Sequence, residues 1–184
     1  MSFLTGQRIK SELEAGRITI SPFIEKHLNP NSYDVTLGNT LLTYKSPQDL
    51  FPWPLDVAEK NETTEIPIPL RGIILQPGIL YLGGTVERIG SKYFVSIIEG
   101  KSSLGRLGFT AHITAGFIDC GFLGNLTLEI TVVHPLRIYR GMRVGQICFS
   151  EISGDVELYK GKYQGNDKVE PSRSWQDFAP EDAA

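Results

Sequence analysis

Short apolar segments, separated by turns rich in glycine and proline, dominate the chain after Pro69 and limit the folds available to it. Six of these segments are rich in β-branched and aromatic residues, as β-strands are; they are 73–75, 79–83, 93–98, 126–133, 136–139 and 144–149. Many short strands joined by tight turns form a β-sandwich, a jelly roll or a barrel. We therefore expect a mainly β fold.

The first part of the chain predicts one helix and few strands. Thr5 is a suitable N-cap for a short amphipathic helix, and Gly16 is a typical residue for its end. Residues 18–20 and 33–37 have the apolar pattern of strands. Between residues 41 and 68 prolines interrupt the pattern, which predicts loops and short edge strands there.

Composition separates a β domain from a polar tail. A chain of 184 residues is long enough to bury a real core as one domain. We expect residues 1–153 to form the β domain that carries the functional site. Residues 154–184 are rich in lysine, glycine, asparagine, aspartate, serine and arginine, which is typical of a solvated terminus. Aromatic and basic side chains in this tail favour a second interpretation, in which it is mobile when empty and closes over a ligand.

Charge and cysteine content exclude several classes of protein. The formal net charge of −3 argues against a non-specific nucleic-acid binder, which needs a basic surface. Two cysteines without a C-x-x-C spacing argue against a disulfide framework and a zinc site. No apolar run reaches the length of a membrane span, and the first residues lack the apolar core of a signal peptide. We expect a cytoplasmic protein, of a cell or of a virus inside one.

Residues 99–108 have the composition of an anion-binding loop. Glycines permit tight backbone paths, serine hydroxyls donate hydrogen bonds to anionic oxygens, and arginine can bind phosphate with two parallel bonds. The residues expected to supply these contacts are Lys101, Ser102, Ser103 and Arg106. An ordinary turn followed by one helical turn, with a solvated arginine, explains the same composition.

Two acidic residues follow this loop closely in the sequence. Gly116 and Gly121 bracket a segment that predicts a β-hairpin, with Asp119 projecting from its turn, where a carboxylate can bind a sugar hydroxyl or a water molecule. An Asx-turn, in which Asp119 bonds its own backbone, is the structural alternative. Glu129 lies in an alternating strand that places Thr127 and Glu129 on the face opposite its apolar residues. That face is either the solvent side of the strand or the wall of a pocket in which a desolvated glutamate moves protons.

Zinc-dependent deaminases carry H-x-E and P-C-x-x-C motifs, and neither occurs in this sequence. Any deamination by this chain would therefore activate water without zinc. His112 follows the anion-binding loop and is a candidate for orienting a site residue; a hydrogen-bonded structural histidine is the alternative.

The order of these segments resembles that of the dCTP deaminase family, which shares a trimeric β fold with the dUTPases. The similarity extends over nearly the whole chain and is carried by segments 29–37, 99–108, 114–121, 126–129, 135–146, 162–165 and 171–174. One departure is Cys120, which stands where the family turn has proline. The resemblance implies a dUTPase-like distorted β-barrel or jelly roll with a short N-terminal helix, assembled as a homotrimer with nucleotide sites at the subunit interfaces.

The resemblance also implies catalytic roles for Glu129, Arg106, Ser102 and Ala115. Glu129 would take a proton from a water molecule that attacks C4 of cytosine, and would then deliver protons to N3 and to the departing ammonia. Ala115 would leave space for that water, and its backbone would help to position it. Magnesium would enter with the triphosphate and would have no protein ligands of its own.

The residues implied to bind the nucleotide come from the loop, the turn, the strand and the tail. The loop residues would hold the triphosphate, Asp119 would contact the 3′-hydroxyl of deoxyribose, and the tail would close over the nucleotide. The full set is Lys101, Ser102, Ser103, Arg106, Asp119, Thr127, Tyr159, Lys162 and Gln164. No nucleic acid and no membrane is expected as a partner.

The leading functional hypothesis is zinc-independent deamination of dCTP to dUTP and ammonia, in the supply of dUTP and dTTP. Residues 114–119 together with Lys101 are more similar to the bifunctional branch, which also hydrolyses the product to dUMP and diphosphate. Acceptance of dCMP and inhibition by dTTP are further possibilities. A plain dUTPase, which has no need of a proton shuttle like Glu129, and a non-catalytic nucleotide-binding trimer are the remaining alternatives.

Overall fold

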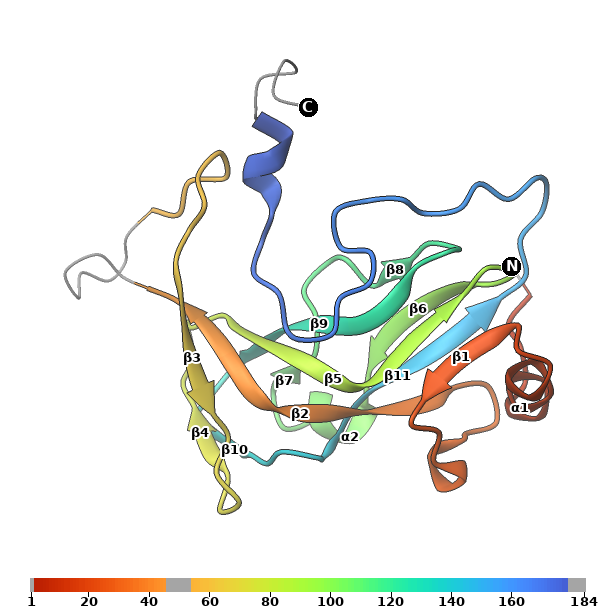
Figure 1. Ribbon diagram of the computed structural model, residues 1–184. Helices are drawn as coiled ribbons and strands as arrows, with labels where there is room; N and C mark the ends of the chain where they lie inside the picture. Colours follow the sequence, from red (N-terminus) through yellow and green to blue (C-terminus); the bar gives the residue numbers. More distant parts are fainter. Residues whose placement is uncertain (1, 46–53, 179–184) are drawn as a thin grey trace.

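The computed structural model describes residues 2–45 and 54–178. Within these residues the strands form one large sheet and a small two-stranded sheet (Figure 1). The strands of the large sheet are β1 (Ile18–Ser21), β2 (Tyr33–Tyr44), β3 (Thr63–Pro67), β5 (Tyr81–Ser91), β6 (Val95–Gly100), β7 (Phe109–Thr110), β8 (Phe117–Ile118), β9 (Leu123–Val132) and β11 (Arg143–Ser150). The small sheet pairs β4 (Ile73–Leu75) with β10 (Leu136–Ile138). The helical elements are α1 (Gly6–Glu14), η1 (Glu25–His27), α2 (Ser102–Gly105) and η3 (Ser174–Phe178). The expected mainly β fold is confirmed.

Two long strands, β2 and β5, organise the large sheet. Its strand order is β7-β9-β5-β2-β11-β6-β8, and β1 and β3 pair with the sides of β5 and β2. The pairing of β2 with β5 shifts register between Leu37 and Leu41, and the pairing of β5 with β9 shifts between Gly84 and Arg88. Because such irregularities bend a strand and increase its twist, the large sheet is strongly curved (Figure 1).

The predicted helix is confirmed, with the predicted ends. Thr5 is the N-cap of α1, and its hydroxyl accepts a hydrogen bond from the Arg8 backbone N–H at 3.3 Å. Gly16 follows the helix with a φ of 69°, a left-handed conformation that glycine adopts without steric cost. The six strand-like segments after Pro69 all overlap strands of the structure.

The prediction of loops and edge strands for residues 41–68 was partly wrong. Residues 41–44 continue β2, which passes without interruption through the turn-like sequence Gly38-Asn39-Thr40. The register shift at this point explains the difference, because a bulge accommodates glycine and asparagine within a strand. Residues 63–67 form the expected edge strand, β3, which pairs only with β2 in the described part of the chain. Residues 46–53 of this segment lie outside the described residues.

The side chains of β9 point alternately into the core and toward a polar face. Leu128 and Ile130 are fully buried, whereas Thr127 and Glu129, which alternate with them, are half-buried. The predicted alternation is therefore confirmed. It holds the polar face of β9 in a fixed orientation, because a one-residue slip would expose every apolar side chain of the strand.

We expect Leu128→Ala to lower the free energy of unfolding by about 2–5 kcal/mol, because it leaves a cavity beneath the polar face of β9. Thr131→Ala, on the opposite face of the same strand, is the matched control and should change stability by less than about 1 kcal/mol. Urea denaturation followed by fluorescence measures both values. Equal effects of the two variants would contradict the assignment of the two faces.

After β11 the chain returns across the large sheet without forming a strand before η3 (Figure 1). The Tyr159 N–H donates to the Cys120 carbonyl at 2.7 Å, and the Asn125 N–H donates to the Asn166 carbonyl at 2.8 Å. The tail is therefore attached to the turn before β9 and to the start of β9. No helix in the described part of the chain is both long enough and apolar enough to cross a membrane.

Candidate active site

A cavity of about 490 Å³ lies between the polar face of β9, the turn before it and the C-terminal tail. Five residues predicted for the site line this cavity: Ala115, Asp119, Thr127, Glu129 and Tyr159. They come from three separate segments of the sequence. The volume suits a nucleoside, since pockets for small molecules span roughly 300–1,000 Å³.

Glu129 is held in one orientation on the cavity wall. Its Oε2 atom accepts a hydrogen bond from the Ile113 backbone N–H at 3.0 Å. Ile113 and Ala115 belong to the segment between β7 and β8, and both line the cavity with Glu129. One oxygen of the carboxylate is therefore positioned by the backbone, and the other remains for a water molecule, as a general base requires.

Asp119 lies at the turn that follows β8, and its side chain is exposed. In the described part of the chain, no hydrogen bond joins its carboxylate to a backbone N–H, which argues against the Asx-turn alternative. The predicted β-hairpin is wrong, because β8 pairs with β6 rather than with β9: Ser96 lies opposite Ile118, and Ile97 opposite Phe117. Asp119 therefore lies where the chain crosses from one side of the large sheet to the other.

Cys120, beside Asp119, is buried. Burial raises the pKa of its thiol, and the nearby charge of Asp119 raises it further. The thiol is therefore protonated at neutral pH, and Cys120 fills space rather than acting as a nucleophile.

The tail is bound to the Asp119 turn through Gln164. Its side-chain oxygen accepts a hydrogen bond from the Leu123 N–H at 2.9 Å, and its side-chain nitrogen donates to the Gly121 carbonyl at 2.7 Å. Both ends of this amide are occupied by protein, so Gln164 supports the turn in this state. Tyr159 packs its ring against Phe122 at a centroid distance of 6.0 Å and forms part of the cavity wall.

The predicted phosphate loop lies outside this cavity. Ser102 and Ser103 begin the single helical turn α2, and their side chains are exposed. Arg106 follows them and is also exposed; its Nη1 donates to the Ser102 carbonyl at 3.0 Å. None of these residues lines the cavity that contains Glu129. Within one chain, the acidic residues and the residues predicted to bind an anion form two separate groups.

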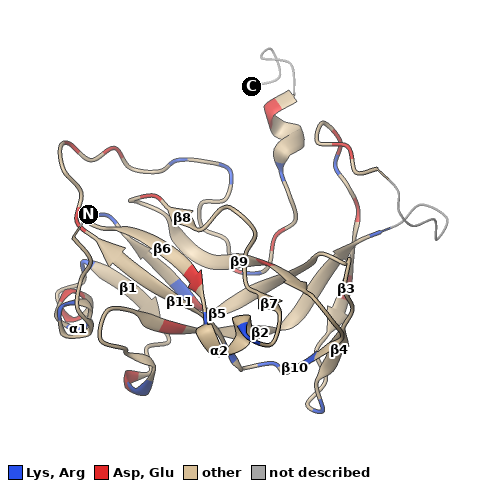
Figure 2. Cartoon of the chain, turned by 180° about the vertical axis from the view of Figure 1, so that it is seen from behind, with Lys and Arg blue, Asp and Glu red and all other residues tan. Residues whose placement is uncertain are grey.

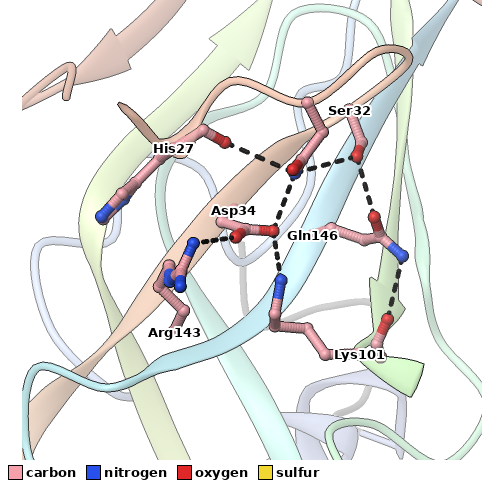
Figure 3. A network of polar contacts seen from close by, with 8 residues as sticks. His27, Ser32, Asp34, Lys101, Arg143 and Gln146 are labelled. Carbon is pink, nitrogen blue, oxygen red and sulfur yellow. Dashed lines mark hydrogen bonds and ion pairs between the residues drawn. The ribbon is translucent and has the colours of Figure 1, made fainter. Parts of the chain in front are cut away.

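Two lysines predicted to bind the nucleotide are engaged with carboxylates of the protein. Lys101 donates to Asp34 at 2.6 Å (Figure 3), and Lys162 donates to Asp177 at 2.5 Å. Neither lines the cavity. Binding of the nucleotide by Lys101 and Lys162 stays a prediction. A bound phosphate would have to compete with these carboxylates for the two ammonium groups.

The cavity also contains residues that the sequence did not indicate. They include Asn125 and Glu170. The Asn125 side chain donates to the Thr85 carbonyl at 2.9 Å, and the Glu170 N–H donates to the Thr127 hydroxyl at 3.0 Å. The Thr127 hydroxyl thus links the strand to the tail. No local pattern marks these residues, because their role depends on where the tail crosses β9.

No group of three or more histidine, cysteine, aspartate or glutamate side chains is close enough to hold a metal ion in residues 2–45 and 54–178. His112 lies beside the cavity-lining segment, and its Nδ1 atom is buried without a hydrogen-bond partner. The structure does not show the hydrogen-bonded histidine that was one of the two interpretations of this residue.

Comparisons with known proteins agree with this geometry. The family model described as dCTP deaminase-like matches residues 3–152. A protein of Leptospira biflexa named dCTP deaminase, dUMP-forming, is 46% identical over 176 residues, which are 95% of this chain and 97% of that protein. A protein of Clostridium acetobutylicum with the same name is also 46% identical, over 95% of this chain and 98% of that protein.

A solved structure supports the fold independently. The crystal structure of 2′-deoxycytidine 5′-triphosphate deaminase from Agrobacterium tumefaciens matches with a TM-score of 0.63 at 23% identity. The match covers 80% of this chain and 48% of that one, so this chain corresponds to about half of the longer protein. Its low sequence identity makes it evidence for the fold alone. The family model and the curated relatives together show that this chain belongs to the dCTP deaminase-like family.

Proposed function

We propose that this protein deaminates dCTP and hydrolyses the resulting dUTP, so that its final products are dUMP, ammonia and diphosphate. The observation that carries this proposal is the cavity in which Glu129 and Asp119 lie together beneath the tail. The curated relatives named dUMP-forming favour this bifunctional reaction over release of dUTP. Nucleotides of this charge do not diffuse across membranes, so we place the reaction in the cytoplasm.

In the proposed deamination, Glu129 takes a proton from water as the water oxygen bonds to C4 of cytosine. The electrons of the C4–N3 double bond move to N3, which receives that proton from Glu129. The carboxylate then transfers the second proton of the attacking water to the amino group, the C4–N bond breaks, and ammonia leaves as the C4 carbonyl forms. The hydrogen bond from Ile113 keeps the carboxylate in place through these transfers.

In the proposed second step, a water molecule attacks the α-phosphorus of dUTP and diphosphate leaves. Asp119 is the candidate base for this step, because its carboxylate is exposed beside the cavity and bonded to no backbone donor in the described residues. The substrate is the magnesium complex of the nucleotide. Phosphate oxygens and water would hold the ion.

We further propose that the site is completed by a second copy of the chain in a homotrimer. Glu129 lies in the cavity, whereas Ser102, Ser103 and Arg106 lie outside it. A neighbouring subunit can supply the serines and Arg106 to the triphosphate. Exposed apolar side chains beside α2, such as Leu107 at 52% and Val133 at 74% exposure, provide surface for such a contact.

Incubation of the purified protein with dCTP, dCMP or dUTP, in magnesium and without added zinc, tests the proposal. Ion-exchange chromatography should show conversion of dCTP to dUMP, and an ammonia assay should show one ammonia for each dCTP consumed. Accumulation of dUTP without dUMP would support the deaminase-only alternative. Consumption of dUTP alone would support a plain dUTPase, and binding without turnover would support a non-catalytic trimer.

A further inference from the structure

We propose that Asp34 and Gln146 are positioning residues, which fix the start of the phosphate loop and so determine how tightly the enzyme holds the phosphates of its substrate. This inference rests on the proposed function of residues 102–106 as phosphate ligands. Neither side chain lines the Glu129 cavity. Both belong to a polar network beneath the loop, and Figure 3 shows them with the residues that they contact.

The first point of attachment is the Lys101 side chain. The Asp34 side chain is only 1% exposed, and its Oδ1 atom accepts hydrogen bonds from Lys101 at 2.6 Å and from the Asn29 amide at 2.9 Å. Its Oδ2 atom accepts a hydrogen bond from Arg143 at 3.1 Å. One buried carboxylate thus holds two cations from different segments of the chain. Figure 2 shows basic segments of the chain beside α2.

The second point of attachment is the backbone one residue earlier. The Gln146 side-chain nitrogen donates to the Gly100 carbonyl at 3.1 Å, and its oxygen accepts a hydrogen bond from the Ser32 hydroxyl at 2.8 Å. Gln146 lies on β11, opposite Asp34 of β2 on one side and opposite Glu99 of β6 on the other. The two attachments therefore hold the end of β6 to its neighbour β11 and to β2, the next strand beyond β11.

These attachments control where the loop begins. Lys101 is the N-cap residue of α2, and its carbonyl accepts hydrogen bonds from Leu104 and Gly105 at 3.0 and 2.9 Å. A shift of the Gly100–Lys101 peptide would therefore move the whole helical turn, including Ser102 and Arg106. Displacement of these groups would weaken their hydrogen bonds to phosphate, because the strength of a hydrogen bond depends on its distance and angle.

The network also assigns a different role to Lys101. One of the three N–H donors of the Lys101 ammonium bonds a buried carboxylate, and the side chain is 21% exposed. Replacing a buried ion pair by apolar residues is often neutral for stability, so the pair alone is weak evidence of a stabilising role. Because the Asp34–Lys101 pair lies at the start of the loop, it can orient the residues that follow.

The test compares Asp34→Asn, Gln146→Ala and the control Glu25→Gln in the full-length protein. Glu25 also pairs with a lysine, Lys10, on the surface near α1 and away from the loop. The binding of inorganic tripolyphosphate is measured by titration calorimetry, and circular dichroism checks that each variant is folded. We expect the dissociation constant to rise about tenfold for Asp34→Asn and Gln146→Ala, and to stay unchanged for Glu25→Gln.

Steady-state kinetics with dCTP supply the second measurement. The KM should rise with the dissociation constant, whereas kcat at saturating dCTP should change by less than about threefold, because the Glu129 cavity is untouched. The double variant should lose less affinity than the product of the two single losses, since both residues act on the same peptide.

Gln146→Ala is the decisive variant, because Gln146 carries no charge and touches the loop only through the Gly100 carbonyl. Wild-type affinity in Gln146→Ala would overturn the inference, as would tighter binding in Asp34→Asn, which is expected if Lys101 is itself a phosphate ligand. If Asp34→Asn does not fold, Gln146→Ala decides alone. Wild-type protein that binds tripolyphosphate without converting dCTP would refute the proposed function. The dissociation constants of the variants for tripolyphosphate would then still decide this inference. Failure to bind tripolyphosphate at all would overturn the inference.

Discussion

Replacement of Glu129 by glutamine should lower kcat for dCTP deamination by about a thousandfold, within the range that general acid–base catalysis contributes. Glutamine has nearly the same shape, and its side-chain oxygen can keep the hydrogen bond from Ile113. It cannot accept the proton of the attacking water at neutral pH. The variant should therefore bind dCTP as tightly as the wild type and still fail to release ammonia.

Titration calorimetry with dCTP and an ammonia assay measure these two properties separately. Glu151→Gln, an exposed glutamate just after β11, is the matched control and should retain full activity. Loss of dCTP binding in Glu129→Gln would mean that the carboxylate holds the nucleotide rather than moving protons. Retention of more than about a tenth of the wild-type kcat would exclude the proton-transfer role altogether.

Replacement of Arg106 by alanine should lower kcat/KM for dCTP by about a hundredfold or more, although Arg106 lies outside the cavity of its own chain. The physical reason is the loss of a guanidinium that would bind phosphate oxygens through two parallel hydrogen bonds. Among the described residues, the Arg106 side chain bonds only the Ser102 carbonyl of its own loop, so its removal should leave the fold intact.

The exposed arginine Arg71 offers a matched control, because it lies on the loop before β4, outside both α2 and the Glu129 cavity. Steady-state kinetics of Arg71→Ala should match those of the wild type. Unchanged kinetics of Arg106→Ala would mean that the loop is the ordinary solvated turn that its composition also allows.

The sequence predicted the elements whose signals are local. The alternation of β9 was sufficient to separate Leu128 from Glu129, since the side-chain period of a strand is two. The N-cap and the terminal glycine of α1 were predictable because helix capping is also a local signal. The second half of β5 was missed because Glu87 interrupts its apolar pattern. That glutamate is fully buried, and its carboxylate accepts hydrogen bonds from the Thr36 N–H at 2.9 Å and hydroxyl at 2.7 Å.

Features that depend on distant partners were not predictable. Asp34 is recognisable as a strand residue, but its partner Lys101 lies 67 residues further along the chain. The pairing of β8 with β6 was likewise invisible, because Gly116 and Gly121 gave the local signal of a hairpin. Sequence order also did not reveal that Arg106 and Glu129 would lie in different places on one chain. Their separation is a property of the complete fold.

Mixing of the two inactive variants tests the shared site most directly. Glu129→Gln and Arg106→Ala are co-expressed with different affinity tags, and trimers that carry both tags are isolated and assayed with dCTP. If one subunit supplies Glu129 and its neighbour supplies Arg106, each trimer that carries both tags has one site with both native residues, so about a third of wild-type activity returns. Activity that stays at the level of the separate variants would contradict a site shared between subunits.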